Sequence, residues 1–160
     1  MKFSRIVILL IPALAFTACK EKLKQEVTAT WPDGSPQKVV FYDESGKTRV
    51  KVKETKYYQG GKKELEGEYT GEKKDGAWTS WFENGRKQSE GFFKNDLRDG
   101  KATVWRENGF KFYEGTYSMG KLHGMWIMYD TDGSRLKEIL YEHDKKIREI
   151  DFKQGVPYGL

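Results

Sequence analysis

Cysteine is almost absent from this sequence. Only one of the 160 residues, Cys19, is a cysteine, so no disulfide can form within the chain and disulfide-framed secreted domains are excluded. Metal ligands are equally sparse, because the two histidines, His123 and His143, are not accompanied by the close cysteine or carboxylate spacing of a zinc site. We expect both to be ordinary surface residues, and we expect neither a metal nor a cofactor.

A long apolar run is also missing. Residues 6–16 are apolar but number only eleven, fewer than the ~20 that a helix needs to cross a bilayer. They follow Lys2 and Arg5 and end in FTAC at residues 16–19, which is the layout of a secretory signal peptide. FTAC resembles the bacterial lipobox, whose cysteine is lipidated and becomes the new N-terminus. We predict a signal peptide at residues 1–18 and lipidation, such as palmitate, at Cys19; a retained anchor helix and an unmodified thiol are the alternatives.

The lipid on Cys19 would hold the protein in a bacterial cell envelope. Two or three acyl chains anchor a protein firmly, because each buried CH₂ contributes ~0.8 kcal/mol. Lys20 stands where an aspartate would resemble an inner-membrane retention signal, so we predict the outer membrane. Residues 19–30 are charged and poor in large apolar side chains, which indicates a lipidated tether. A short first helix is the alternative there.

A strong excess of one charge is missing too. The chain has 29 basic and 24 acidic residues, and removal of residues 1–18 leaves 27 basic and 24 acidic, a net charge of +3. The two signs are interleaved, whereas nucleic-acid binders gather basic residues on one face. We therefore expect no nucleic-acid partner.

What the sequence does contain is a repeat of 24 residues from position 61 onward. A glycine recurs at this interval, with a glutamate five residues after it and an aromatic residue eight after it. These columns are Gly61, Gly85, Gly109 and Gly133; Glu66, Glu90, Glu114 and Glu138; and Tyr69, Phe93, Tyr117 and Tyr141. A fixed period of this length indicates one supersecondary unit per repeat.

The unit is predicted to be a β-hairpin. The turn pairs are Gly–Gly, Asn–Gly, Asn–Gly and Asp–Gly, which favour two-residue type I′ turns, and the flanks are rich in strand-forming residues. Polar connections of about six residues, such as 94–99 and 118–123, return the chain to the next hairpin. We predict an all-β fold over residues 31–160, an elongated single-layer antiparallel meander of 24-residue hairpins.

The predicted register assigns side chains to faces. A two-residue turn places Thr79 opposite Glu90 and Trp78 opposite Gly91, so that a large ring lies over a glycine. Alternation along the strands then puts the column Trp81, Trp105 and Tyr129 on the face of the glutamates. The other face is predicted to carry Trp78 and Trp126 with a basic column, Lys63, Lys87, Lys111 and Arg135.

GAWTSWFENG at residues 76–85, followed by Glu90, Gly91 and Phe93, resembles the MORN repeat. The likeness is closest to its bacterial variant, found in exported proteins and in the YwqK-type group of toxin–antitoxin antitoxins. It extends over residues 61–159. The resemblance implies one elongated twisted sheet that binds or braces other molecules, and it implies no reaction.

These features predict a protein that acts by binding other molecules. The glutamates repeat regularly, which indicates cross-strand support rather than paired acid–base catalysis, so we expect no enzyme activity. A single-layer sheet cannot bury both faces, so Trp81, Trp105 and Tyr129 form the candidate binding face, with strand packing as the alternative. Our first hypothesis is an envelope lipoprotein that acts as a scaffold or adaptor for a protein partner. Alternatives are a carbohydrate-binding surface module, an antitoxin- or immunity-like protein, and self-association through edge strands.

Overall fold

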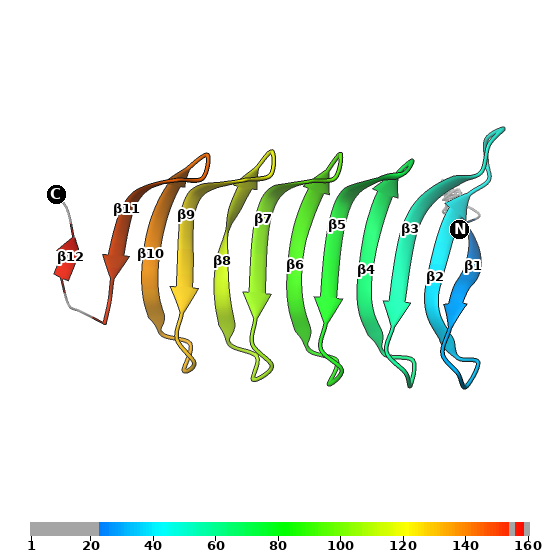
Figure 1. Cartoon of the computed structure of the whole chain (residues 1–160), viewed down its shortest axis with the longest axis horizontal. Coiled ribbons are helices and arrows are strands. Elements are labelled where there is room, and N and C mark those ends of the chain that lie inside the picture. The colour runs from blue at the N-terminus through cyan, green and yellow to red at the C-terminus, as the bar shows by residue number, and fades with distance from the viewer. Residues whose placement is uncertain (1–22, 154–155, 159–160) are drawn as a thin grey trace, which may run out of the picture.

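The computed structural model describes residues 23–153 and 156–158. Its strands form one twelve-stranded antiparallel sheet in which they follow one another in chain order (Figure 1). The strands are β1 (Leu23–Thr30), β2 (Pro36–Asp43), β3 (Val50–Tyr57), β4 (Lys63–Thr70), β5 (Lys73–Trp81), β6 (Lys87–Lys94), β7 (Leu97–Trp105), β8 (Lys111–Ser118), β9 (Lys121–Tyr129), β10 (Arg135–Glu142), β11 (Lys145–Asp151) and β12 (Val156–Tyr158).

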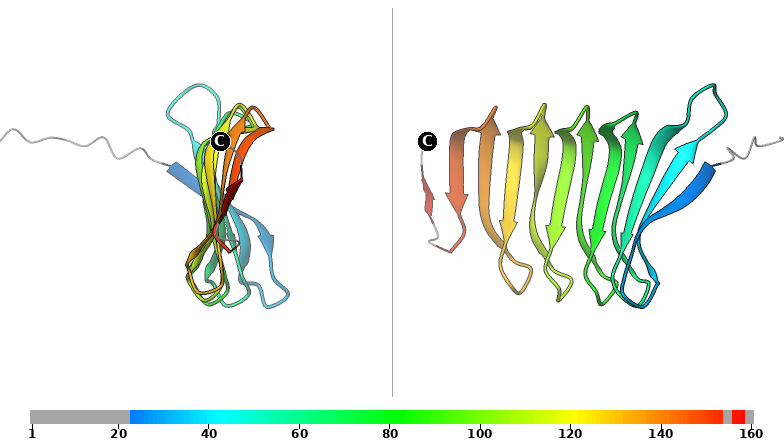
Figure 2. Two further views of the ribbon diagram at one scale, coloured as in Figure 1. Left: turned by 90° about the vertical axis from the view of Figure 1, so that its left-hand side faces the viewer. Right: turned by 45° about the vertical axis from the view of Figure 1, so that its right-hand side comes forward.

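Seen edge-on, the sheet is a single thin and twisted layer (Figure 2). The predicted all-β meander of hairpin repeats is therefore confirmed. None of the described residues belongs to a helix that is long and apolar enough to cross a membrane. The predicted signal peptide and Cys19 lie outside the described residues.

The sheet begins earlier in the chain than the sequence indicated. Much of the segment predicted to be a tether, residues 19–30, is strand β1, which pairs with β2 through contacts such as Val27 opposite Val39. Residues 23–30 bury little apolar surface, but β-pairing satisfies their backbone N–H and C=O groups. Ion pairs across the sheet, such as Glu26 with Arg49, accommodate their charges. The tether prediction therefore does not apply to residues 23–30.

The Asn–Gly and Asp–Gly turns differ from the predicted type. Between β5 and β6 the Phe82 N–H donates to the Arg86 carbonyl at 2.9 Å, and the Gly85 N–H donates to the Phe82 carbonyl at 2.8 Å. Gly85 has a φ of 87°, whereas Asn84 stays outside the positive-φ region and its Oδ1 accepts the Arg86 N–H at 2.9 Å. This is a three-residue loop, a type I turn followed by a left-handed glycine. The type I′ prediction is wrong at this turn because the asparagine side chain stabilises the alternative conformation.

The two-residue turns instead occur at the opposite end of the hairpins. Lys94 pairs with Leu97 across Asn95 and Asp96, whose φ values are 50° and 70°. Positive φ at both central positions is the type I′ pattern. Asp96 also joins this turn to the previous hairpin, because its N–H donates to the Lys74 carbonyl at 2.9 Å and its Oδ1 accepts the Lys74 N–H at 2.8 Å. Most of the expected six-residue connection is therefore strand.

Beyond the turns, the predicted register is confirmed: Thr79 pairs with Glu90 and Trp78 with Gly91. The prediction that the Trp78 ring lies over Gly91 is wrong, because its indole N–H donates to the Glu68 carbonyl and the ring lies over Gly67 of the other neighbouring strand. Ser80 pairs with Ser89 but Trp81 pairs with Lys87, so Gln88 is an extra residue in a β-bulge. The extra residue of the bulge compensates for the extra residue of the three-residue loop, so the strands return to the predicted register from Ser80 and Ser89 onward.

It also turns Lys87 to the face of Glu90, and the Lys87 Nζ lies 2.7 Å from that carboxylate. The same contact joins Lys63 to Glu66, Lys111 to Glu114 and Arg135 to Glu138. The basic column therefore lies with the glutamates, and its predicted placement beside Trp78 and Trp126 is wrong. We call this side the glutamate face and the side with Trp78 and Trp126 the tryptophan face.

The repeat core lies on the tryptophan face. Trp78 and Trp126 are each 7% exposed, and their indoles lie over Gly67 and Gly115 of the preceding strand. Each indole N–H donates to a backbone carbonyl at 3.1 Å. Edge-to-face contacts extend the row: Tyr69 with Trp78 at 5.4 Å, Trp78 with Phe93 at 5.7 Å, and Tyr117 with Trp126 at 4.9 Å. A row of rings thus takes the place of a second layer.

Candidate functional site

The predicted binding column lies on the glutamate face. Trp81, Trp105 and Tyr129 are the last residues of β5, β7 and β9, so they stand at the same end of the sheet, two strands apart. Two strand spacings correspond to about 9.6 Å. All three side chains are partly exposed, in contrast to the buried Trp78 and Trp126. The structure therefore brings the three predicted residues into one row and leaves them accessible.

Each ring of this column lies beside a lysine ammonium from the previous hairpin. The Lys87 Nζ is 5.9 Å from the centroid of Trp105 and 2.7 Å from the Glu90 carboxylate. The arrangement repeats with Lys63, Glu66 and Trp81, and with Lys111, Glu114 and Tyr129. We call each set a Lys–Glu–aromatic triplet. The lysines were missed as members of the site because the bulge reverses their face, although their spacing three residues before each glutamate is visible in the sequence.

The triplet with Tyr129 is the most tightly connected. The Tyr129 hydroxyl donates to Glu114 Oε1 at 2.5 Å. Desolvation, together with this hydrogen bond and the charge of Glu114, raises the pKa of Tyr129 to about 12. Hydrogen bonds from Lys111 and Tyr129 hold the pKa of Glu114 below its usual range. Glu114 is therefore an ionised acceptor at neutral pH, which suits positioning of its neighbours and not proton donation.

The charges of the triplets are neutralised within the glutamate face. Side chains of Lys87 and Glu90 are 53% and 41% exposed, and ion pairs this exposed contribute only ~0–1 kcal/mol to stability. Their main effect is to fix alternating charges around the rings. Two large apolar side chains that the sequence analysis did not single out, Phe92 and Met125, extend this face and are 50% and 37% exposed.

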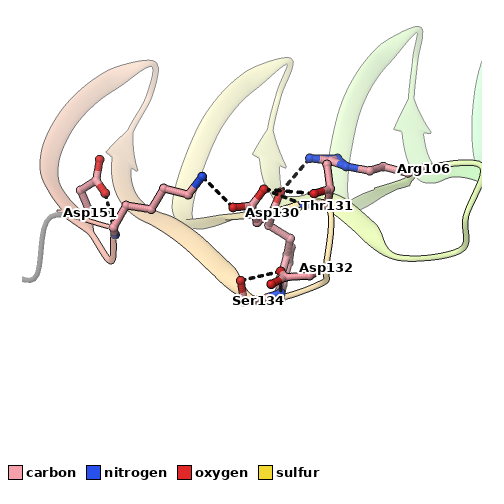
Figure 3. Close-up of polar contacts among 8 residues, drawn as sticks. Arg106, Asp130, Thr131, Asp132, Ser134 and Asp151 are labelled. Atoms are coloured by element: carbon pink, nitrogen blue, oxygen red, sulfur yellow. Dashed lines mark hydrogen bonds and ion pairs between the residues drawn. The ribbon is translucent and has the colours of Figure 1, made fainter.

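Polar contacts fix the turn that follows Tyr129 (Figure 3). Arg106 donates from its guanidinium to the Tyr129 carbonyl at 2.9 Å, and Lys153 forms an ion pair with Asp130 at 2.7 Å. Asp132 Oδ1 accepts hydrogen bonds from both the N–H and the hydroxyl of Ser134. The end of strand β9 is therefore held from both neighbouring hairpins, which limits the orientations open to Tyr129.

The two histidines lie together at the other end of the sheet. Their ring centroids are 5.0 Å apart, and His123 Nδ1 is buried without a hydrogen-bond partner in the part of the chain that the structure describes. No group of three potential metal ligands occurs among the described residues. We expected both histidines to be surface residues. His143 is exposed, whereas His123 is partly buried.

Comparison with known protein families matches residues 74–95 to the MORN repeat variant. The matched segment is the β5–β6 hairpin, which contributes Trp81, Lys87 and Glu90 to the triplets. A search among curated proteins found no match to this chain. The chain thus contains a MORN-type repeat, and its hairpin sheet repeats the same geometry over the neighbouring units.

Proposed function

We propose that this chain is a non-enzymatic scaffold that binds a protein partner through the glutamate face of its sheet. The observation that supports this proposal is the repetition of the Lys–Glu–aromatic triplet along an accessible face, flanked by exposed Phe92 and Met125. Aromatic side chains surrounded by fixed polar groups are typical of protein interfaces. An ammonium beside each ring would compete with the stacking of a sugar, so the arrangement favours a protein over a carbohydrate.

We also propose that the scaffold is exported and held in the cell envelope by a lipid on Cys19. The support for this part is the layout of residues 1–19, in which two basic residues, an apolar segment and FTAC follow one another. A scaffold held on a membrane in this way would present its sheet to other envelope proteins.

The experiment is a crosslinking pull-down from intact envelopes with the full-length protein. It compares the wild type with a triple variant, Trp81→Ala, Trp105→Ala and Tyr129→Ala. Hot-spot aromatics contribute ~2 kcal/mol each, so we expect even one substitution to weaken the purified complex roughly 30-fold. The matched control, Phe110→Ala with Met119→Ala, removes exposed apolar side chains at turns and should retain the partner. Circular dichroism checks that each variant keeps its sheet.

A protein that is enriched by the wild type and the control, and is lost with the triple variant, would support the proposal. Equal enrichment by all three proteins would contradict it. Binding of the wild type to an envelope glycan, with no protein enriched, would also contradict it and would favour the carbohydrate-binding alternative.

A further inference from the structure

The tryptophan column of the core is interrupted at Ala102, which lies 24 residues from both Trp78 and Trp126. Trp78 covers Gly67 and Trp126 covers Gly115, but the equivalent Gly91 pairs with Ala102 and has no ring above it. A Cβ built on Gly91 would meet an Arg98 guanidinium nitrogen at 3.5 Å and the Ala102 Cβ at 3.8 Å. The missing indole therefore leaves a gap in the row of rings, and Arg98 reaches into it.

Two aromatic rings hold Arg98 in that gap. Its guanidinium carbon lies 5.2 Å from the centroid of Phe93 and 5.4 Å from that of Tyr117. Lys74 occupies the equivalent position one hairpin earlier, with its Nζ 4.2 Å from the centroid of Trp78 and 5.2 Å from that of Phe93. Rings attract cations without neutralising them. Phe93 therefore lies between two cations that keep their full charge.

Neither Lys74 nor Arg98 forms an ion pair with any other residue that the structure describes. Lys51, which lies 3.5 Å from the ring centroid of Tyr69 on the same face, differs because its Nζ is 2.8 Å from Glu54. The lysines of the Lys–Glu–aromatic triplets are likewise paired. Lys74 and Arg98 thus bring two cations without a carboxylate partner to the same ring, that of Phe93.

A pocket of about 160 Å³ lies between these two cations. Trp78 and Phe93 form its aromatic walls, and Ser80 and Ser89 line it with hydroxyl groups whose oxygens are 2.7 Å apart. Glu90 also borders the pocket, but it pairs with Thr79 on the glutamate face, where Lys87 holds its carboxylate. The pocket thus offers two cationic donors and two hydroxyls beside apolar rings.

We propose that this pocket binds the carboxylate side chain of an acidic peptide segment in a partner protein. A guanidinium presents paired N–H donors that match the two oxygens of a carboxylate, and a nearby ammonium adds attraction for the same charge. Ser80 and Ser89 are hydrogen-bonded to each other, so one hydroxyl proton is left to turn toward the ligand, and the rings suit the methylene groups of a glutamate. This site lies on the opposite face from Trp81, Trp105 and Tyr129, so it is separate from the proposed scaffold face.

The test is an NMR titration of the ¹⁵N-labelled full-length protein with tetraglutamate, and with tetraglutamine as the neutral peptide. We expect tetraglutamate to shift the Trp78 indole N–H and the Gly91 amide saturably, and tetraglutamine to leave both unchanged. Arg98→Gln should weaken tetraglutamate binding at least tenfold, and Arg98→Lys should restore part of it. Lys145→Gln removes an exposed cation at the start of β11, far from the pocket, and is the matched control, which should bind like the wild type.

Ala102→Trp gives a second test that keeps both cations. An indole at this position should cover Gly91 as Trp78 covers Gly67, displace the Arg98 side chain and abolish tetraglutamate binding. Equal shifts with tetraglutamine, undiminished binding by Ala102→Trp or Arg98→Gln, or saturation by inorganic phosphate alone would each overturn the proposal. The variant with Trp81→Ala, Trp105→Ala and Tyr129→Ala should still bind tetraglutamate. Failure of the scaffold proposal can therefore be distinguished from failure of the acidic-peptide proposal.

Discussion

Trp78 lies against Gly67 so closely that the glycine has no room for a side chain. A Cβ on Gly67 would stand 2.2 Å from Cδ2 and Cε2 of the indole. The ring is fixed there by the hydrogen bond from its N–H to the Glu68 carbonyl at 3.1 Å. Trp126 and Gly115 repeat the relationship two hairpins later, also with a Cβ distance of 2.2 Å. The glycine and the tryptophan therefore act as one packing unit on a sheet that has no second layer.

Gly67→Ala should destabilise the sheet, because the added methyl group forces the Trp78 indole away from its strand and its hydrogen bond. Overpacking of this kind costs about 1–3 kcal/mol. The measurement is thermal unfolding followed by circular dichroism, in which each kcal/mol lowers the midpoint by roughly 2–6 °C for a domain of this size.

Gly91→Ala is the matched control, since Gly91 belongs to the same column but faces Ala102. Its added methyl group meets only ordinary contacts at 3.5–3.8 Å, and we expect a change in midpoint close to zero. A Gly67→Ala protein that unfolds at the same temperature as Gly91→Ala would show that the indole does not depend on the glycine.

Met119→Gly should stabilise the protein. Met119 is 73% exposed and has a φ of 50°, a conformation that is unfavourable for a residue with a Cβ. The strained conformation of Met119 costs of order 1 kcal/mol, and glycine removes that cost. Part of the gain is lost because glycine gives the unfolded chain more conformational freedom. We expect a net gain of a few tenths of a kcal/mol in urea unfolding. Met119→Ala removes the same exposed side chain but keeps the Cβ, so it should give no gain; equal gains in both variants would contradict the explanation.

The sequence was sufficient to predict the hairpin repeat and its register, and it misassigned the turns. Asn84 and Gly85 matched the favoured type I′ pair, but the Asn84 side chain accepts the Arg86 N–H and stabilises a three-residue loop. Asn95 and Asp96, which do form the two-residue turn, lack the glycine that usually marks it. Their positive φ is supported by Lys74 of the previous hairpin, a contact between strands that no local sequence pattern contains.

The position of the aromatic column of the candidate site was predicted correctly, but the lysines beside it were assigned to the wrong face. Alternation along each strand correctly placed Trp81, Trp105 and Tyr129 together, because all three precede the bulge. Lys87 follows the turn and precedes the bulge at Gln88, so alternation counted from Glu90 assigned it to the wrong face. The pocket near Arg98 exists because Ala102 carries no aromatic ring. The residues that line it come from several strands, and the sequence alone does not show that their side chains meet.

Tyr129 should ionise only near pH 12, because its hydroxyl is desolvated and donates to the charged Glu114 carboxylate. Glu114→Gln removes that charge and should lower the pKa of Tyr129 toward its ordinary value near 10. The measurement is an NMR titration that follows the ¹³Cζ resonance of Tyr129. Glu90→Gln changes the equivalent glutamate beside Trp105 and should leave this resonance unchanged. A pKa of Tyr129 that is the same in Glu114→Gln and the wild type would contradict the prediction.

Glu54 is a buried carboxylate on the tryptophan face, with its side chain 7% exposed. Burial alone would raise the pKa of Glu54, but hydrogen bonds from Lys51 at 2.8 Å and Lys38 at 3.2 Å outweigh that effect and hold the pKa below its usual value of 4.5. The unfolded chain therefore takes up a proton more readily than the folded chain does. The stability that Glu54 contributes is present above about pH 4.5 and is lost as the pH falls through its folded-state pKa.

Glu54→Gln should consequently destabilise the protein most at neutral pH, where it leaves Lys38 and Lys51 without their carboxylate. We expect a loss of about 1–3 kcal/mol at pH 7, since a buried group loses its charged hydrogen bonds. Urea unfolding at pH 7 and pH 3 measures the difference between wild type and variant, which should narrow in acid because the wild type loses this contribution. Glu72→Gln, an exposed glutamate at a turn, is the control and should give a small difference at both pH values. A gap between Glu54→Gln and wild type that stays constant from pH 7 to pH 3 would show that the ionised carboxylate does not stabilise this part of the sheet.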